Sequence, residues 1–170
     1  MLAYGADHLG TVNVHGVMLM VKDSPILTGV LIGLLADAVK LGVNYLGYIL
    51  GFTDVVFWQI VATNILPKEY LFTTSAIIIG AVADLTVTGL LGVLFLYFIK
   101  FTGLDFLFLK GIGFAMLVWV GLMGVVVGPY VEAKLPQDPS GIFVTIVAHF
   151  VFGVSLAVFT SFLYRPDEDS

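Results

Sequence analysis

Four long stretches of this sequence are apolar enough to enter a lipid bilayer, and they constrain the fold more than any other feature. A helix crosses the hydrocarbon core of a bilayer with about 20 apolar residues. Each stretch reaches that length, and the connections between them are short. The sequence therefore predicts an all-α polytopic membrane protein, an antiparallel bundle of four transmembrane helices. The four spans lie at about residues 26–52, 70–99, 107–128 and 141–164.

The composition supports this class and excludes several functions. Of the 170 residues, 59% are apolar and 11% are charged, and the mean hydropathy is +1.07. Soluble domains carry about twice this share of charged residues, and a chain this short cannot hide so much apolar surface without lipid. The absence of cysteine excludes disulfides and thiolate metal sites. No basic run could neutralise phosphates, so we expect no nucleic-acid partner.

The first span contains charges in an otherwise apolar setting. In the stretch Gly29–Asn44, GVLIGLLADAVKLGVN, the residues Asp37, Lys40 and Asn44 fall on one helix face. The pattern G-x-x-A-D-x-x-x-x-G within it occurs again in the second span, where Asp84 takes the place of Asp37. A charge placed twice in the same small-residue setting indicates a polar element inside the membrane.

The two aspartates are predicted at nearly the same depth. At 1.5 Å per residue, each lies roughly 16–21 Å from the face at which its helix starts, close to the midplane. Lys40 follows Asp37 by one turn, a spacing at which side chains meet. A lone charge at the bilayer centre costs about 2.5–3.5 kcal/mol, so we expect these groups to face each other or a wet cavity. The predicted polar cluster consists of Asp37, Lys40, Asn44, Asp84 and His149.

Two functions are compatible with this cluster. In the first, which the pairing of Lys40 with Asp37 favours, the cluster holds two helices in register, and the protein is a structural or accessory membrane subunit. It would act through helix–helix contacts with other membrane proteins or with copies of itself. The alternative is a small proton- or cation-coupled transporter or channel that uses Asp37 and Asp84. The repeated pattern in two antiparallel helices is typical of an inverted pair around a midplane site.

Glycines in the spans predict close helix packing. Helices in lipid approach each other where side chains are small, and the G-x-x-x-G spacing is the best known pattern. The sequence contains this spacing at Gly29 and Gly33 in the first span and at Gly124 and Gly128 in the third. Contacts within the chain are the first interpretation and homo-oligomerisation the second. The predicted packing residues are Gly29, Gly33, Gly80, Gly89, Gly124 and Gly128.

The remaining segments are too short to span. Residues 1–24 are predicted as an N-terminal arm, extended or interfacial, and residues 166–170 as an acidic C-terminal tail, which leaves residues 25–165 as the transmembrane domain. The aromatic residues of Asp54–Leu66 predict a short interfacial helix between the first two spans.

No catalytic or cofactor site is predicted. The H-E-x-x-H, G-x-S-x-G and P-loop patterns are absent. His8 and His15 alone are too few ligands for a metal site, and His149 is the single histidine within a span, which leaves a haem short of an axial ligand. Asp37 and Asp84 lack the sequence contexts of intramembrane aspartyl proteases. We therefore expect no enzyme, no cofactor and no metal.

Basic residues predict the orientation. One side of the membrane receives Lys22, Lys100, Lys110 and Arg165, and the other receives Lys68 and Lys134. The positive-inside rule then places both termini in the cytoplasm.

Four short groups of residues suggest a relationship to known proteins. They are Gly33–Gly42, Phe57–Gln59, Lys110–Phe114 with Trp119, and Ala148–Gly153. Over about residues 26–164, the chain resembles small bacterial four-span membrane proteins of unknown function. This resemblance implies a compact helical bundle in a bacterial cytoplasmic membrane, and it implies no activity.

Overall fold

The computed structural model describes residues 24–122 and 138–164, and all regular structure within these ranges is helical. Three helices are long and apolar enough to cross a membrane, and a fourth apolar helix is shorter. The five α-helices are α2 (Pro25–Ile49), α3 (Phe57–Ala62), α4 (Thr74–Thr102), α5 (Leu107–Trp119) and α7 (Pro139–Leu163). A single 3₁₀ turn, Lys68–Tyr70, precedes α4.

The all-α class is thus confirmed, whereas four clear spans are not present among the described residues. The third predicted span reached residue 128, but α5 ends at Trp119 and residues 123–137 lie outside the described ranges. The second helix begins at Thr74 instead of residue 70, because Pro67 and the 3₁₀ turn occupy the preceding residues. The short helix predicted within Asp54–Leu66 is present as the six residues of α3.

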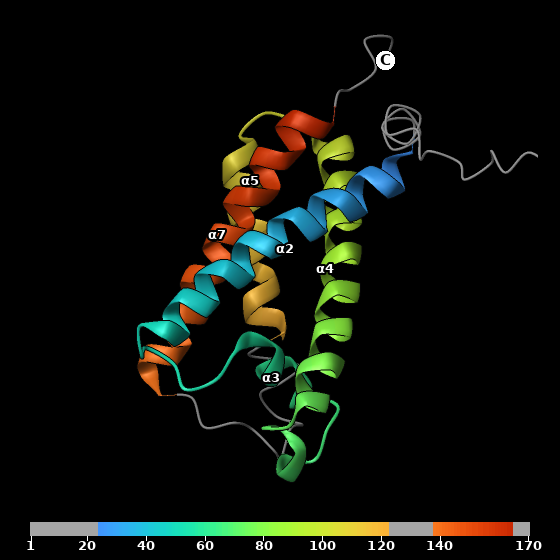
Figure 1. Cartoon of the computed structure of the whole chain (residues 1–170). Helices are drawn as coiled ribbons and strands as arrows, with labels where there is room; N and C mark the ends of the chain where they lie inside the picture. Colours follow the sequence, from blue (N-terminus) through green and yellow to red (C-terminus); the bar gives the residue numbers. More distant parts are fainter. Residues whose placement is uncertain (1–23, 123–137, 165–170) are drawn as a thin grey trace, which may run out of the picture.

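The helices alternate in direction. Figure 1 shows α2 and α5 running one way and α4 and α7 running the other, so that the start of α2 and the end of α7 lie at one end of the bundle. We call this the terminal end and the opposite one, which carries α3, the α3 end. The helices pack side by side in the order α4, α2, α7 and α5.

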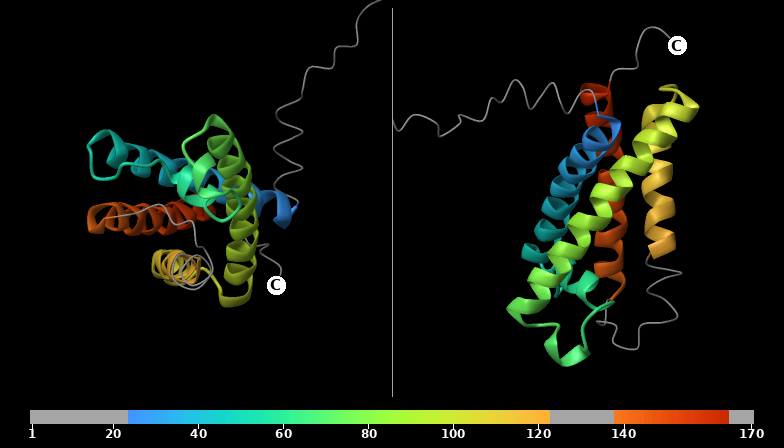
Figure 2. Two further views of the ribbon diagram at one scale, coloured as in Figure 1. Left: turned by 90° about the horizontal axis from the view of Figure 1, so that it is seen from below. Right: turned by 90° about the vertical axis from the view of Figure 1, so that its right-hand side faces the viewer.

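The two outer helices of this order, α4 and α5, have few contacts with each other. Figure 2 shows them close together at the terminal end, where the short connection of residues 103–106 joins them, and apart toward the α3 end. Gly103 makes the turn possible with a φ of 79°, a conformation that L side chains rarely adopt. The side of the bundle between α4 and α5 is therefore less closely packed than the others.

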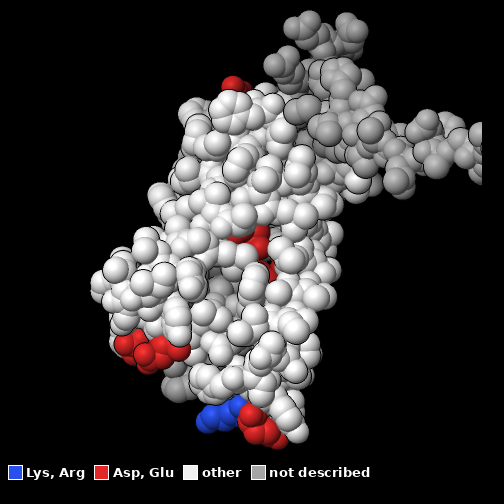
Figure 3. All heavy atoms as spheres, viewed as in Figure 1, with Lys and Arg blue, Asp and Glu red and all other residues white. Residues whose placement is uncertain are grey.

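Much of the surface of the described residues is apolar. Large apolar side chains are exposed along the long helices, including Leu46, Val82, Leu90, Leu94, Phe143 and Phe150. Exposed or partly exposed charges lie in connections or in the end turns of helices, as Lys100 and Lys110 do. Figure 3 shows this distribution on one face, with acidic atoms visible midway along it only in a hollow.

Helix α3 packs on α4 at one end of the bundle. Val55, Phe57 and Ile60 form a small buried core there with residues that precede and begin α4. The Gln59 side chain fixes the segment, because its Oε1 accepts from Val56 N at 3.0 Å and its Nε2 donates to Leu71 O at 3.2 Å. This packing directs Phe57 toward the centre of the bundle, where it contacts Lys40.

Asp138 caps the start of α7. Its Oδ1 accepts a hydrogen bond from Gly141 N at 2.8 Å. The Ser140 hydroxyl lies 2.8 Å from Asp138 Oδ2 and 2.7 Å from the Phe52 carbonyl oxygen, and it donates to one of them at a time. These hydrogen bonds, that from Gly141 first, hold the pKa of Asp138 below its ordinary value of about 3.9.

We expect this cap to make stability depend on pH. Because the pKa of Asp138 is lowered in the folded state, this residue stabilises the fold above its unfolded pKa. The stabilisation is lost as the pH falls through the folded pKa. Asp138→Asn keeps a capping oxygen but removes the charge. At pH 7 the thermal unfolding midpoint of wild type should be higher than that of Asp138→Asn. This difference should disappear as the pH falls below about 4. A difference independent of pH would contradict this account of the cap.

Candidate functional site

The structure brings Asp37, Lys40 and Asp84 together inside the bundle. Lys40 Nζ forms an ion pair with Asp37 Oδ1, one turn back on α2, and lies 2.8 Å from Asp84 Oδ1 on α4. The three residues are 0%, 2% and 4% exposed. One ammonium group is therefore shared between two carboxylates that belong to different helices.

The cluster lies near the middle of the long helices. Asp37 is the central residue of α2, with twelve residues on either side within Pro25–Ile49. Asp84 follows the start of α4 by ten residues, about 15 Å along the helix axis. A bilayer that covers these helices would therefore place all three charges within its hydrocarbon core.

The charges of the cluster do not balance. With all three groups ionised, two carboxylates and one ammonium carry one net negative charge. Asp84 Oδ2 is buried and has no hydrogen-bond partner among the described residues. Buried polar atoms are normally paired, so an unpaired carboxylate oxygen indicates a position where a proton or another donor can bind.

Two phenylalanine rings surround the ammonium group. Lys40 Nζ lies 4.2 Å from the centroid of the Phe57 ring and 5.7 Å from that of Phe152. A cation over an aromatic face gains about 0.5–2 kcal/mol, more when water is excluded. The rings thus hold Lys40 between the carboxylates and leave it little access to other partners.

His149 of α7 faces the same region without bonding to the three charges. Its Nδ1 lies 2.8 Å from the carbonyl oxygen of Thr145, which can only accept, so Nδ1 carries the proton and Nε2 of the neutral ring is an acceptor. Thr145 Oγ1 also accepts from the indole N–H of Trp119 at 3.1 Å, which links α5 to α7 at this level.

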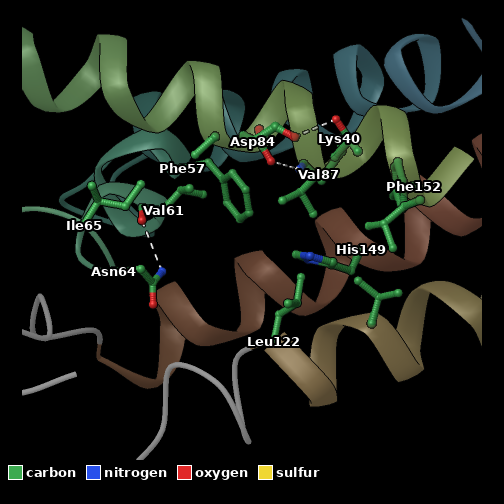
Figure 4. A pocket seen from close by; sticks show the side chains of 14 residues that line it. Lys40, Phe57, Val61, Asn64, Ile65, Asp84, Val87, Leu122, His149 and Phe152 are labelled. Atoms are coloured by element: carbon green, nitrogen blue, oxygen red, sulfur yellow. Dashed lines mark hydrogen bonds and ion pairs between the residues drawn. The ribbon is translucent and has the colours of Figure 1, made fainter. Parts of the chain in front are cut away.

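A cavity of about 270 Å³ joins these groups. Lys40, Asp84 and His149 provide its charged and titratable lining, and most of the remaining wall is apolar. Figure 4 shows the His149 ring directed into the space between α4, α5 and α7, with Asp84 on the opposite wall. The lining residues are Lys40, Phe57, Val61, Asn64, Ile65, Ala83, Asp84, Val87, Thr88, Leu91, Val118, Leu122, His149 and Phe152.

This cavity extends from the cluster toward the α3 end. Asn64 and Ile65, which follow α3 and are exposed, line its outer part. On the terminal side of the cluster, a buried apolar core that includes Ile32, Phe95 and Leu96 fills the bundle. Along the bundle axis, access to Asp84 in the described part of the chain is therefore from the α3 end and not from the terminal end.

Asn44 is buried but takes no part in the cluster. It lines a second cavity, between α2 and α3, together with Trp58. Neither the side-chain amide of Asn44 nor the indole N–H of Trp58 has a hydrogen-bond partner among the described residues. Of the predicted stripe, Lys40 thus lines the first cavity and Asn44 the second, while Asp37 lines neither.

Glycines bring α2 and α4 close enough for the Lys40–Asp84 ion pair to form. A Cβ on Gly33 would lie 3.0 Å from the Cα and N of Gly92, and one on Gly29 would meet the backbone of Val93. Gly80 packs in the same way on the Trp58 backbone, whereas Gly89 has an ordinary contact with a valine side chain. The two remaining predicted packing residues, Gly124 and Gly128, lie outside the described residues.

Two features of the site were not predicted. Phe57 was assigned to an interfacial helix, and no sequence pattern signals its contact with Lys40. Gly111 and Gly153 pack α5 against α7 backbone to backbone, but each stands outside a G-x-x-x-G pair within its own helix. The residues described offer no group of three acidic or histidine side chains that could hold a metal ion.

Fold and site together define a helical protein with three candidate membrane-spanning helices and a buried cluster of three charges. Comparison of the chain with protein-family models, with curated proteins and with solved structures finds no match. The resemblance to small four-span bacterial proteins therefore stays a prediction, and function must be argued from the geometry.

Proposed function

We propose that this protein is a small proton- or cation-coupled membrane transporter whose binding centre is the Asp37–Lys40–Asp84 cluster. The observation that carries the proposal is the sharing of one lysine between two buried carboxylates at the end of a one-sided cavity. An excess negative charge in the hydrocarbon core costs about 2.5–3.5 kcal/mol, so a proton or monovalent cation is stabilised by binding there.

One-sided access suits a transport cycle. A carrier exposes its midplane site to one side of the membrane at a time. In the described residues the cavity reaches Asp84 from the α3 end, and the apolar core around Phe95 closes the terminal side. Opening the terminal side would require α2 and α4 to move relative to α7, which changes the surroundings of both aspartates together.

We also propose that the chain crosses the membrane four times. Helices α4 and α7 run in the same direction, so the chain between Thr102 and Pro139 has to return across the bilayer. Helix α5 runs in that return direction, and its apolar stretch Leu107–Leu122 covers about 24 Å of the crossing. These helix directions support four crossings, with α5 as the third.

The orientation follows from the basic residues. Among the described residues, Lys100 and Lys110 lie at the terminal end of the bundle and Lys68 at the α3 end. The positive-inside rule then places the terminal end, and with it both chain termini, in the cytoplasm. The cavity in this arrangement opens toward the outer side.

Proton flux in proteoliposomes tests the transport function. Purified protein is reconstituted with a pH-sensitive dye inside the vesicles, and a pH gradient is imposed. We expect wild type to dissipate the gradient faster than empty vesicles, and Asp84→Asn and Asp37→Asn to lose most of this flux. Each variant removes the excess negative charge while retaining one partner for Lys40.

Asp105→Asn is the matched control, because Asp105 is an exposed acid in the connection between α4 and α5. Its flux should equal that of wild type. The transport proposal fails if wild-type vesicles show no flux, or if the flux persists unchanged in both cluster variants.

A structural or accessory membrane subunit is the second candidate. It is favoured because Lys40 links α2 to α4, and such a link fixes the register of the two helices. The described glycine contacts are all within the chain and so do not by themselves indicate a partner. This candidate predicts assembly, and a strictly monomeric mass in mild detergent, measured by light scattering, would contradict association with further copies.

A further inference from the structure

We propose that the cavity between α4, α5 and α7 binds an organic cation with a small apolar body, and that this cation takes the place of the proton on the cluster. The inference deepens the proposed function, on which it rests, by naming the chemical class of substrate. It is carried by the polar residues that line the cavity, by the nature of its walls and by its position beside α4 and α5.

Two of the polar groups that line the cavity, Asp84 and His149, offer acceptors. Asp84 Oδ2 is unpartnered, and Asp84 is more than nine-tenths buried. His149 adds an acceptor, because its Nδ1 proton is directed to the Thr145 carbonyl. The one cationic lining group, Lys40, is already engaged by two carboxylates. A ligand with positive charge therefore complements this site, and an anion does not.

The walls suit an apolar body of limited size. Phe57 and Phe152 present aromatic rings close to the charges, and such faces attract cations. Aliphatic side chains such as Val87 and Leu91 form much of the rest. The volume of about 270 Å³ exceeds that of an engineered cavity of about 150 Å³ that binds benzene. One aromatic ring with a compact ammonium group fits this space.

The cavity lies where a molecule dissolved in the bilayer can reach it. Val87 on α4 is exposed, and Val118 on α5 is partly exposed. Both line the cavity, one from each of the two helices that diverge. Within the described residues, this side of the bundle is the least closely packed. An apolar cation, which partitions into a membrane, can approach the cavity from this side.

The charge balance requires an exchange. The cluster with one bound proton is neutral, and a monovalent cation that binds in its place restores the same neutrality and releases that proton. The titratable or charged groups that face the site are Asp37 and Lys40 of α2, Asp84 of α4 and His149 of α7. The described residues of α3 and the cavity-lining residues of α5 contribute none.

Binding of benzyltrimethylammonium to the full chain in neutral detergent tests the inference. Its uncharged carbon isostere, neopentylbenzene, has nearly the same shape. We expect isothermal titration calorimetry to show the cation binding roughly tenfold or more tightly than the isostere. A pH indicator in weakly buffered solution should report about one proton released per cation bound. Equal affinity for the two molecules would overturn the proposal.

Two variants and a control locate the site. Asp84→Asn should weaken cation binding roughly tenfold or more, and Val118→Trp should do the same by filling the cavity without changing a charge. Asp105→Asn should bind as wild type does. Folded Val118→Trp that binds the cation with wild-type affinity would overturn the proposal. Proton flux without cation binding refutes this inference alone, whereas cation binding without flux supports it and refutes the transport function.

Discussion

Lys40→Met is expected to destabilise this protein by about 3–5 kcal/mol, the usual cost of removing one partner from a buried ion pair. Lys40 is 2% exposed and neutralises both Asp37 and Asp84. Without it, two carboxylates of the same sign face each other in a low-dielectric interior, where repulsion is strong. Methionine has nearly the same volume, so the change tests charge and not packing. Unfolding by sodium dodecyl sulfate in mixed micelles, followed by circular dichroism, measures the loss.

Two further variants isolate the electrostatic cause. Lys40→Met combined with Asp37→Asn and Asp84→Asn removes all three charges, and most of the lost stability should return, because neutral groups do not repel each other. Lys100→Met, at the exposed end of α4, should change stability by less than about 0.5 kcal/mol. If Lys40→Met loses no more stability than Lys100→Met, the three-charge cluster does not hold the two helices together.

The local part of the site could be predicted from the sequence. Asp37 and Lys40 are three residues apart on one helix, and that spacing fixes their proximity wherever the helix lies. To predict the contact with Asp84, it was also necessary to place the two aspartates at equal depth in antiparallel helices. The repeated sequence pattern indicated this equal depth. The start of α2 follows its capping residues, because Ser24 accepts from Leu27 N and Pro25 occupies the first turn.

The cavity could not be predicted, because it depends on distances between helices. How far α5 diverges from α4 is set by packing against α7, through Gly111 and Gly153, and no periodicity within either helix encodes it. The position of Phe57 over Lys40 likewise depends on how the chain folds back after α2. The sequence also predicted Asn44 in the cluster, because Asn44 lies on the same helix face as Asp37 and Lys40. In the structure Asn44 instead lines the second cavity, between α2 and α3.

Gly33→Ala is expected to weaken the α2–α4 contact and, as a consequence, to reduce transport. The added Cβ would lie 3.0 Å from two backbone atoms of Gly92 and still closer to the Thr88 carbonyl oxygen. Backbone atoms cannot rotate away, so the helices must separate. Overpacking of this kind costs about 1–3 kcal/mol. Separation also lengthens the Lys40–Asp84 contact, which spans the same two helices. Stability in micelles and flux in proteoliposomes should therefore fall together.

Gly42→Ala on the same helix provides the matched control for this prediction. Gly42 is exposed and a Cβ there meets nothing within 4 Å, so the same substitution gains helix propensity of up to about 1 kcal/mol without a clash. Wild-type flux with unchanged or increased stability is expected. A Gly33→Ala protein that matches Gly42→Ala in both measurements would show that the close approach of α2 and α4 is not required. If Gly33→Ala loses stability but keeps its flux, the Lys40–Asp84 contact can lengthen without harm, and the cluster acts through its net charge alone.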